Sequence, residues 1–153
     1  EVVMDPVWLA EAKRFKNLRE IEDRRLSHPI LDKMARYLGL NDFQDDEPWC
    51  TMFVAYCLKS TIPDIVLPRH LMWSRAFEKW GQELDAPRPG AVMVYWRGKS
   101  PKDDLGHVGF YLKPGLTYGY SKLISGNYSN MVLEHDMSDE KLVSIRWPIV
   151  GGE

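Results

Sequence analysis

Residues 48–60 have the sequence PWCTMFVAYCLKS, the strongly apolar stretch around which the fold is predicted to form. Trp49, Met52, Phe53 and Tyr56 recur at the spacing of one face of an α-helix. The proline at the start favours the first turn of a helix, where its missing N–H needs no partner. We therefore predict a central helix over 48–60, with one wide buried face.

Both cysteines of the chain, Cys50 and Cys57, fall in this predicted helix. Seven residues of helix separate their Cα atoms by about 10.5 Å, beyond the roughly 7 Å limit for a disulfide. We expect two free thiols, so the cysteine content does not decide the redox compartment. Cys57 lies two turns deeper and is expected to be a packing residue.

Three further helices are predicted around the central one. Asp5 and Pro6 form a cap and a first turn, and apolar residues then recur at helical spacing as far as Leu18. A second helix is expected from Ser27 to Gly39, because glycine suits a helix end. A fourth, shorter helix is expected over 68–80, whereas the charged segments 19–27 and 41–47 are expected to be connections.

The pattern changes after the turn signal at 87–90. Apolar and β-branched residues then follow a period near two, which predicts strands over 91–96, 108–112, 118–124, 131–135 and 142–147. Helices first and strands afterwards indicate an α+β fold with an antiparallel sheet. The chain of 153 residues has no repeat and fits one domain, which we assign to residues 1–153.

Charge and hydropathy argue against several classes of partner. The formal net charge is −2 and the pI is near 6.1, so we expect no nucleic acid and no attachment to an anionic membrane. No run of 18 apolar residues occurs, so no membrane insertion is expected. The first residues, EVVMD, lack the basic and apolar regions of a signal peptide.

Cys50 is the candidate nucleophile. It falls in the first turn of the predicted helix, where unpaired N–H groups and the helix dipole present partial positive charge. With an imidazole nearby, this position is expected to lower the thiol pKa, so that Cys50 is alkylated early. The same N–H groups are suited to hold the oxyanion of a tetrahedral intermediate. The acidic residues 45–47 oppose a negative sulfur unless their side chains point away.

His107 is the candidate base. In the sequence GHVGFY (106–111) it opens an apolar strand between glycines, which allow a backbone or a substrate to approach closely. Asn127 follows the next strand, and its side-chain oxygen is suited to accept the second imidazole N–H and hold the tautomer. The other histidines lack such a setting and are expected to be exposed: His28, His70 and His135.

These motifs together resemble one known family. The segments DEPWC (46–50), RPGAV (88–92), GHVGFY (106–111) and Gly126-Asn127 are similar to the CHAP family of cysteine, histidine-dependent amidohydrolases and peptidases, and to its NlpC-like relatives. The likeness extends from residue 6 onward and is nearest to a compact branch of cell-wall hydrolases from phages and bacteria. It implies a papain-like fold, a cysteine at a helix start, a histidine on a strand, a polar third residue, and cleavage of amides in peptidoglycan.

Two departures from the family pattern concern the third catalytic residue. A glycine is usual before the Gly-Asn pair, whereas this chain has Ser125. Many members also carry an acidic residue soon after the histidine strand, where this chain has Lys113; the next acids, Glu134 and Asp136, lie far along the chain. Asn127 stays the predicted orienting residue, although Gly-Asn is also a common turn sequence that needs no catalytic purpose.

Three residues beside the predicted triad are candidate substrate contacts. Trp49 adjoins the nucleophile and Gly106 adjoins the base. Asp46 is suited to bind the free amine of a diamino-acid side chain, although a solvated helix cap is its simpler role. Tryptophans are more often core residues, and we expect at least three of four to be structural: Trp49, Trp73, Trp80 and Trp96. Segment 97–104 is expected to be a mobile hairpin loop beside the site.

The resemblance and the residues together predict a peptidoglycan hydrolase that cleaves an amide in the stem peptide, or at the glycan–peptide junction, through a Cys50 thioester. Two alternatives stay open: a deamidase or acyltransferase acting on a protein, and a non-catalytic binding module on the same fold. No cofactor and no metal are expected. We expect a monomer that acts on bacterial peptidoglycan in the periplasm or cell wall, either as a phage lysin released by a holin or as an interbacterial effector with secretion machinery and an immunity protein as partners. The sequence does not rank these settings.

Overall fold

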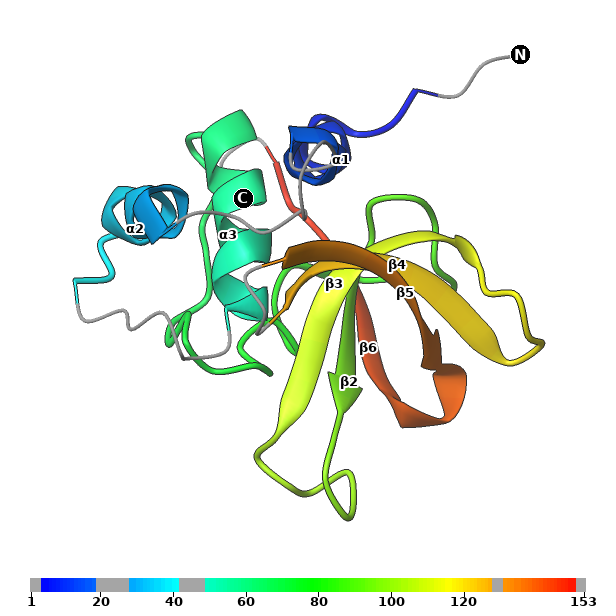
Figure 1. Cartoon of the computed structure of the whole chain (residues 1–153). Coiled ribbons are helices and arrows are strands. Elements are labelled where there is room, and N and C mark those ends of the chain that lie inside the picture. Colours follow the sequence, from blue (N-terminus) through cyan, green and yellow to red (C-terminus); the bar gives the residue numbers. More distant parts are fainter. Residues whose placement is uncertain (1–3, 19–27, 42–48, 128–130, 151–153) are drawn as a thin grey trace.

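Figure 1 shows a computed structural model of the protein, which describes residues 4–18, 28–41, 49–127 and 131–150. Three helices are present in these ranges: α1 (Val7–Leu18), α2 (His28–Tyr37) and α3 (Cys50–Thr61). They confirm the first three predicted helices, and the helix end expected at Gly39 has the positive φ of 77° that favours glycine. Ser27, Pro48 and the two predicted connections lie wholly or largely outside the described residues.

The second half of the chain forms one antiparallel sheet in the order β1-β6-β2-β3-β4-β5. Its strands are β1 (Gln82–Glu83), β2 (Val92–Trp96), β3 (Gly106–Pro114), β4 (Tyr120–Asn127), β5 (Met131–Ser138) and β6 (Leu142–Trp147). A 3₁₀ turn, η1 (Asp139–Lys141), joins the last two strands. The α+β fold with an antiparallel sheet is therefore confirmed. The five predicted strands are present, three of them longer than expected, whereas the two-residue β1 was not predicted.

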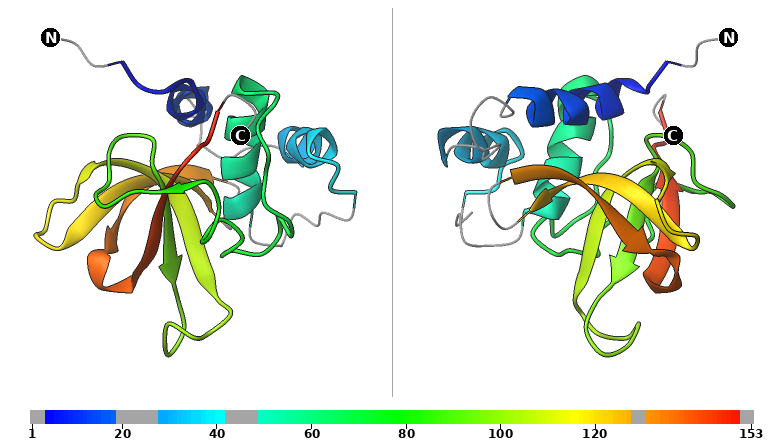
Figure 2. Two further views of the ribbon diagram at one scale, coloured as in Figure 1. Left: turned by 180° about the vertical axis from the view of Figure 1, so that it is seen from behind. Right: turned by 45° about the vertical axis from the view of Figure 1, so that its right-hand side comes forward.

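The three helices gather on one side of the sheet, and the views in Figure 2 agree on this arrangement. α3 lies at the centre, packed against α1, α2, β3 and β4. All nine residues from Cys50 to Leu58 are buried, so this helix is enclosed on every side and not along one face only. Such burial suits a helix that is apolar all round, and it makes α3 a rigid support for the residue at its start.

Strand residues of opposite parity fill the two faces of the sheet. Val94, Val108 and Ile124 join the main core beneath the helices. A second buried cluster includes Met93, Tyr95 and residues of β3, β4 and β6: Tyr111, Leu123 and Ile145. Alternation along each strand therefore sets which side chains face the helices and which face the opposite side.

Segment 68–80 forms successive turns, so the helix predicted there is wrong. Its backbone hydrogen bonds link residues three apart, such as Trp73 N–H to His70 C=O at 2.8 Å and Glu78 N–H to Arg75 C=O at 3.1 Å. His70 also has a positive φ of 61°, which a right-handed helix does not contain. Side chains of this segment bond to distant parts of the chain, and those tertiary bonds outweigh its helical spacing.

Cys50 and Cys57 are both free thiols, as expected. None of the described helices is both long enough and apolar enough to serve as a membrane span.

Candidate active site

The candidate nucleophile lies at the start of α3, as predicted. Cys50 is the first residue of the helix and is 5% exposed. The first helical hydrogen bond runs from the Phe53 N–H to the Trp49 carbonyl, at 2.9 Å. The N–H groups of the first turn therefore point out of the helix end beside the sulfur. They present partial positive charge where an oxyanion would form.

The acidity of the Cys50 thiol differs from the expectation. Burial raises its pKa, and hydrogen bonds with Val108 and Thr51 and the charge of Arg97 oppose that rise only in part. The predicted lowering of this pKa is therefore wrong, because removal from water outweighs the field of the helix start. Cys50 is a neutral thiol at neutral pH and needs a base to become a nucleophile.

The start of α3 packs on β3, and the backbone of Val108 lies near enough to the Cys50 thiol to lower its pKa. Val108 directly follows His107, so the candidate base lies one residue along β3 from the backbone that faces Cys50; contact between the thiol and the His107 ring stays a prediction. α3 packs on both β3 and β4. The starts of α3 and β3 are therefore neighbours in space, although more than fifty residues separate them in sequence.

The imidazole of His107 is half-buried near the start of β3. Burial, followed by the nearby His135 and Arg97, lowers its pKa to about 3. The ring is therefore neutral at neutral pH, and a neutral imidazole is the form that can accept a proton. Both predicted catalytic groups are therefore neutral at neutral pH, and their pairing stays a prediction.

Two residues that the sequence did not assign to the site complete the surroundings of His107. The Nε2 atom of His107 lies 2.9 Å from Ser125 Oγ, and the same oxygen lies 2.7 Å from Nε2 of His135. The two ring centroids are 5.1 Å apart, and the ring planes are inclined at 65° in an edge-on arrangement. The prediction that His135 is solvent-exposed is wrong, because β5 packs its ring against the site, where it is half-buried.

Strand register explains why these side chains meet. Phe110 pairs with Ile124, which sets Gly109 opposite Ser125. A Cβ added to Gly109 would lie 2.9 Å from the Ser125 Cβ, so only glycine leaves room at this point. The His107 ring can therefore lean along β3 toward the serine. His135 lies opposite Leu123 and reaches Ser125 along the diagonal.

Asn127 was predicted to hold the second nitrogen of His107. Its backbone ends β4, two residues beyond Ser125 and of the same parity, and its side chain lies outside the described part of the structure. Ser125 occupies the hydrogen-bonding position at His107 Nε2. The role of Asn127 stays a prediction, and the alternation Ser-Gly-Asn is the sequence signal that could have drawn attention to Ser125.

The three predicted substrate contacts have different outcomes. Trp49 is 1% exposed and packs edge-on against Phe53, with ring centroids 5.9 Å apart, so its ring belongs to the core and its burial does not support a substrate contact. Gly106 is explained by packing, because a Cβ there would lie 2.5 Å from Arg75 Cγ. Its contact with substrate stays a prediction. Asp46 lies outside the described residues.

Segment 73–78, predicted as helix, bridges the two halves of the site. The Trp73 carbonyl accepts a hydrogen bond from Thr51 Oγ1 at 2.8 Å, beside Cys50. The Trp73 indole N–H donates to the carbonyl of Asp104 at 3.0 Å, close before His107. One residue therefore contacts both the start of α3 and the loop that leads into β3.

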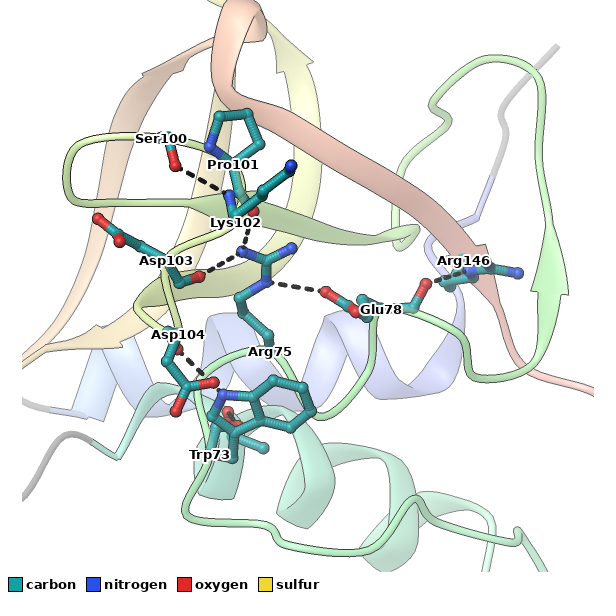
Figure 3. A network of polar contacts seen from close by, with 10 residues as sticks. Trp73, Arg75, Glu78, Ser100, Pro101, Lys102, Asp103, Asp104 and Arg146 are labelled. Carbon is teal, nitrogen blue, oxygen red and sulfur yellow. Dashed lines mark hydrogen bonds and ion pairs between the residues drawn. The ribbon is translucent and has the colours of Figure 1, made fainter.

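Arg75 strengthens the same bridge (Figure 3). Its Nη1 donates to the carbonyls of Pro101 and Asp103, each at 2.8 Å, and its Nε donates to Glu78 at 2.8 Å. The loop between β2 and β3 was expected to be mobile, yet a buried guanidinium ties it to segment 73–78. This bridge limits how far the start of β3 can move relative to α3.

Arg97 is a further functional candidate that the sequence did not single out. It is exposed at the end of β2, and its charge lowers the pKa of both Cys50 and His107. The positive charge favours a thiolate over a thiol and opposes an imidazolium. Within the described ranges, no three His, Cys, Asp or Glu side chains are grouped as metal ligands would be.

Comparison with known proteins agrees with this geometry. The profile of the CHAP domain family matches residues 42–127, which is more than half of the chain and includes Cys50, His107 and Ser125. A search of curated proteins finds no match. With a cysteine at the start of its central helix and a histidine on the adjoining strand of an α+β fold, this chain belongs to the CHAP domain family.

Proposed function

We propose that this protein is a peptidoglycan hydrolase that cleaves an amide bond through a thioester on Cys50, with His107 as the base. The observation that carries the proposal is the position of Cys50 at the start of a helix that packs on the strand of His107, inside the range matched by the CHAP profile. Family membership supports a cysteine- and histidine-dependent amidohydrolase or peptidase, and a peptidoglycan-hydrolase or amidase type of function in general.

The reaction begins from neutral partners. His107 accepts the proton of Cys50 as the sulfur attacks the amide carbon, so charge separation accompanies formation of the C–S bond. The N–H groups of the first turn of α3 stabilise the oxyanion. His107 then gives its proton to the leaving amine, and the C–N bond breaks.

The second half of the reaction regenerates the enzyme. Water attacks the thioester carbon while His107 accepts one of its protons. The C–S bond breaks, the carboxyl product leaves, and the proton returns to Cys50. Every proton transfer uses the same nitrogen of His107, so the position of the proton on its other nitrogen decides whether the cycle can begin.

Replacement of Cys50 by alanine tests the proposal. Cys50→Ala should abolish the loss of turbidity of purified peptidoglycan while leaving the circular dichroism spectrum unchanged. Cys57→Ala is the matched control, because Cys57 is a fully buried thiol of the same helix, outside the proposed machinery. This control should remain active. A fully active Cys50→Ala protein would end the proposal.

The products of cell-wall digestion identify which amide bond is cut. Mass spectrometry of digested cell wall should show new amine and carboxyl ends, either within the stem peptide for an endopeptidase or at the lactyl group of the glycan for an amidase. A digest without new ends would favour a protein deamidase or acyltransferase on the same scaffold. We propose the periplasm or cell wall as the site of action, in a phage lysin or an interbacterial effector.

A further inference from the structure

Three polar side chains from neighbouring strands form a continuous hydrogen-bonded row that starts at the candidate base. His107 on β3, Ser125 on β4 and His135 on β5 are linked by the two contacts of 2.9 and 2.7 Å. Ser125 is 1% exposed, so water has little access to its hydroxyl. His135 lies beyond the range that the family profile matches, so its place here comes from the geometry of this chain.

Hydrogen counting restricts the states of this row. A serine hydroxyl has one hydrogen to donate, and a neutral imidazole has one protonated and one bare nitrogen. Ser125 lies between two Nε2 atoms, so it donates to one ring and accepts from the other. Accepting from both rings would leave the buried hydroxyl hydrogen without a partner among the described contacts, so opposite tautomers are favoured: if His135 has a bare Nε2, His107 carries its proton on Nε2.

The surroundings of the Nδ1 atom of His135 select between the two combinations of tautomers. The Nε2 atom of His135 is engaged with Ser125, so Nδ1 is the ring nitrogen left for its other neighbour, Asp136, whose backbone and carboxylate both raise the pKa of the ring. An electron-rich neighbour of this kind favours the proton on Nδ1. His135 Nε2 is then bare and accepts the Ser125 hydrogen. Ser125 in turn accepts from His107 Nε2–H.

We propose that His135, acting through the hydroxyl of Ser125, holds His107 in the tautomer that carries its proton on Nε2 and leaves Nδ1 bare. This inference rests on the proposed function in one respect: a bare Nδ1 is what His107 needs to take the proton of Cys50. His135 and Ser125 are positioning residues, since they act on the reaction through His107. Together they orient the imidazole of His107, the role expected of an acidic residue or an asparagine.

Protonation of His135 reverses the direction of the hydrogen bonds in this row. A doubly protonated ring donates from Nε2, so the Ser125 hydrogen turns toward His107 and favours the Nδ1–H tautomer, which cannot accept the thiol proton. Burial lowers the pKa of His135, and Lys122 lowers it further, while Asp136 raises it. The charged and titratable groups on the packed elements are His107 on β3, Lys122 on β4, Glu134 and Asp136 on β5, and Lys16 on α1. The hydrogen-bond direction that favours the Nε2–H tautomer of His107 is therefore present at neutral pH and lost in acid.

Nitrogen NMR of the ring-labelled full chain reads each tautomer without any substrate. Wild type should show His107 protonated on Nε2 and His135 on Nδ1, with the exposed His70 as an internal reference. In His135→Phe the Ser125 hydrogen has only His107 Nε2 to bond, so His107 should change to Nδ1–H. In His135→Gln the amide oxygen accepts in place of the ring, so the wild-type tautomer should remain.

The double variant gives the sharpest test. With Ser125→Ala added to His135→Phe, nothing forces a proton onto Nδ1, so His107 should return toward Nε2–H. Turbidity loss should fall at least about tenfold in His135→Phe, since a wrong tautomer can cost up to about 10⁴-fold. It should recover in part in the double variant. A role in packing alone predicts the reverse, because removing a second buried group adds damage.

The two proposals fail separately. His107 protonated on Nδ1 in wild type, or a tautomer unchanged in His135→Phe, would overturn the inference even if the protein digests cell wall. Predicted tautomers in a protein that leaves peptidoglycan intact would overturn the proposed function alone. His135→Gln should also lose less activity than wild type between neutral and mildly acidic pH, because glutamine does not titrate.

Discussion

Replacing Arg75 with methionine tests whether one buried guanidinium holds the loop that leads into His107. The side chain is 10% exposed and donates to Glu78 and to the carbonyls of Pro101 and Asp103. Breaking a fully buried ion pair costs about 3–5 kcal/mol. Glu78 stays 20% exposed and water can reach the loop carbonyls, so we expect the low end of that range, about 3 kcal/mol.

A loss of about 3 kcal/mol lowers the Tm of a chain of this size by about 6–12 °C. Thermal unfolding followed by circular dichroism measures this shift. Arg14→Met is the matched control, because Arg14 also pairs with a glutamate three positions away at 2.8 Å, but its side chain is 54% exposed. Exposed pairs contribute about 0–1 kcal/mol, so the control should unfold close to wild type.

The rate of peptidoglycan digestion should fall together with the stability. Arg75→Met should digest peptidoglycan at least about tenfold more slowly well below its Tm, because a misplaced catalytic group costs up to about 10²-fold. Arg75→Lys should recover part of the stability, since an ammonium can donate to one or two of the three acceptors. Equal Tm values for Arg75→Met and Arg14→Met would refute the reasoning.

Three other outcomes are expected. Iodoacetamide should alkylate Cys50 at pH 7 no faster than an ordinary thiol, because burial raises its pKa, and Arg97→Gln should slow the reaction further; rapid alkylation at pH 7 would contradict this. Gly126→Ala should lose about 1–3 kcal/mol in urea unfolding, because its Cβ would lie 2.6 Å from the Trp49 ring; unchanged stability would show that the ring moves freely. His107 has a folded pKa of about 3 against an ordinary 6.5, so the unfolded chain binds the proton first as pH falls. Wild type should therefore lose about 2 kcal/mol more than His107→Gln between pH 7 and pH 5, and equal losses would exclude a buried neutral ring.

The elements that could be predicted are those with a strong local pattern. The apolar residues 49–58 specify α3 because no solvated arrangement can cover them. The change from helical to alternating spacing after residue 90 specifies the sheet. Segment 68–80 shows the limit, because the bonds of Trp73 and Arg75 to residues near 104 depend on tertiary structure. The two-residue β1 exists only through its pairing with β6.

The candidate site also contains residues that could be predicted from the sequence and residues that could not. Cys50 and His107 belong to motifs whose local positions carry chemical meaning, a helix start and a strand between glycines. Ser125 has only the weak signal of standing two residues before Asn127, and His135 has none, because their contact depends on the register of three strands. The direction of the Cys50 pKa was also beyond prediction. A helix start can be located from sequence, whereas the depth at which it is buried depends on the packing of the whole domain.

One strand beyond residue 127, β5, belongs to the proposed hydrogen-bonded row. β6 is the neighbour of β2 on the side away from β3, and β5 is the neighbour of β4. Without β5 the hydroxyl of Ser125 would lose its partner on His135 and would exchange bonds with water, which accepts and donates equally well. The tautomer of His107 would then follow only the intrinsic preference of an imidazole. The range 42–127 that the family profile matches therefore contains the predicted nucleophile and base, but not the histidine proposed to fix the tautomer of that base.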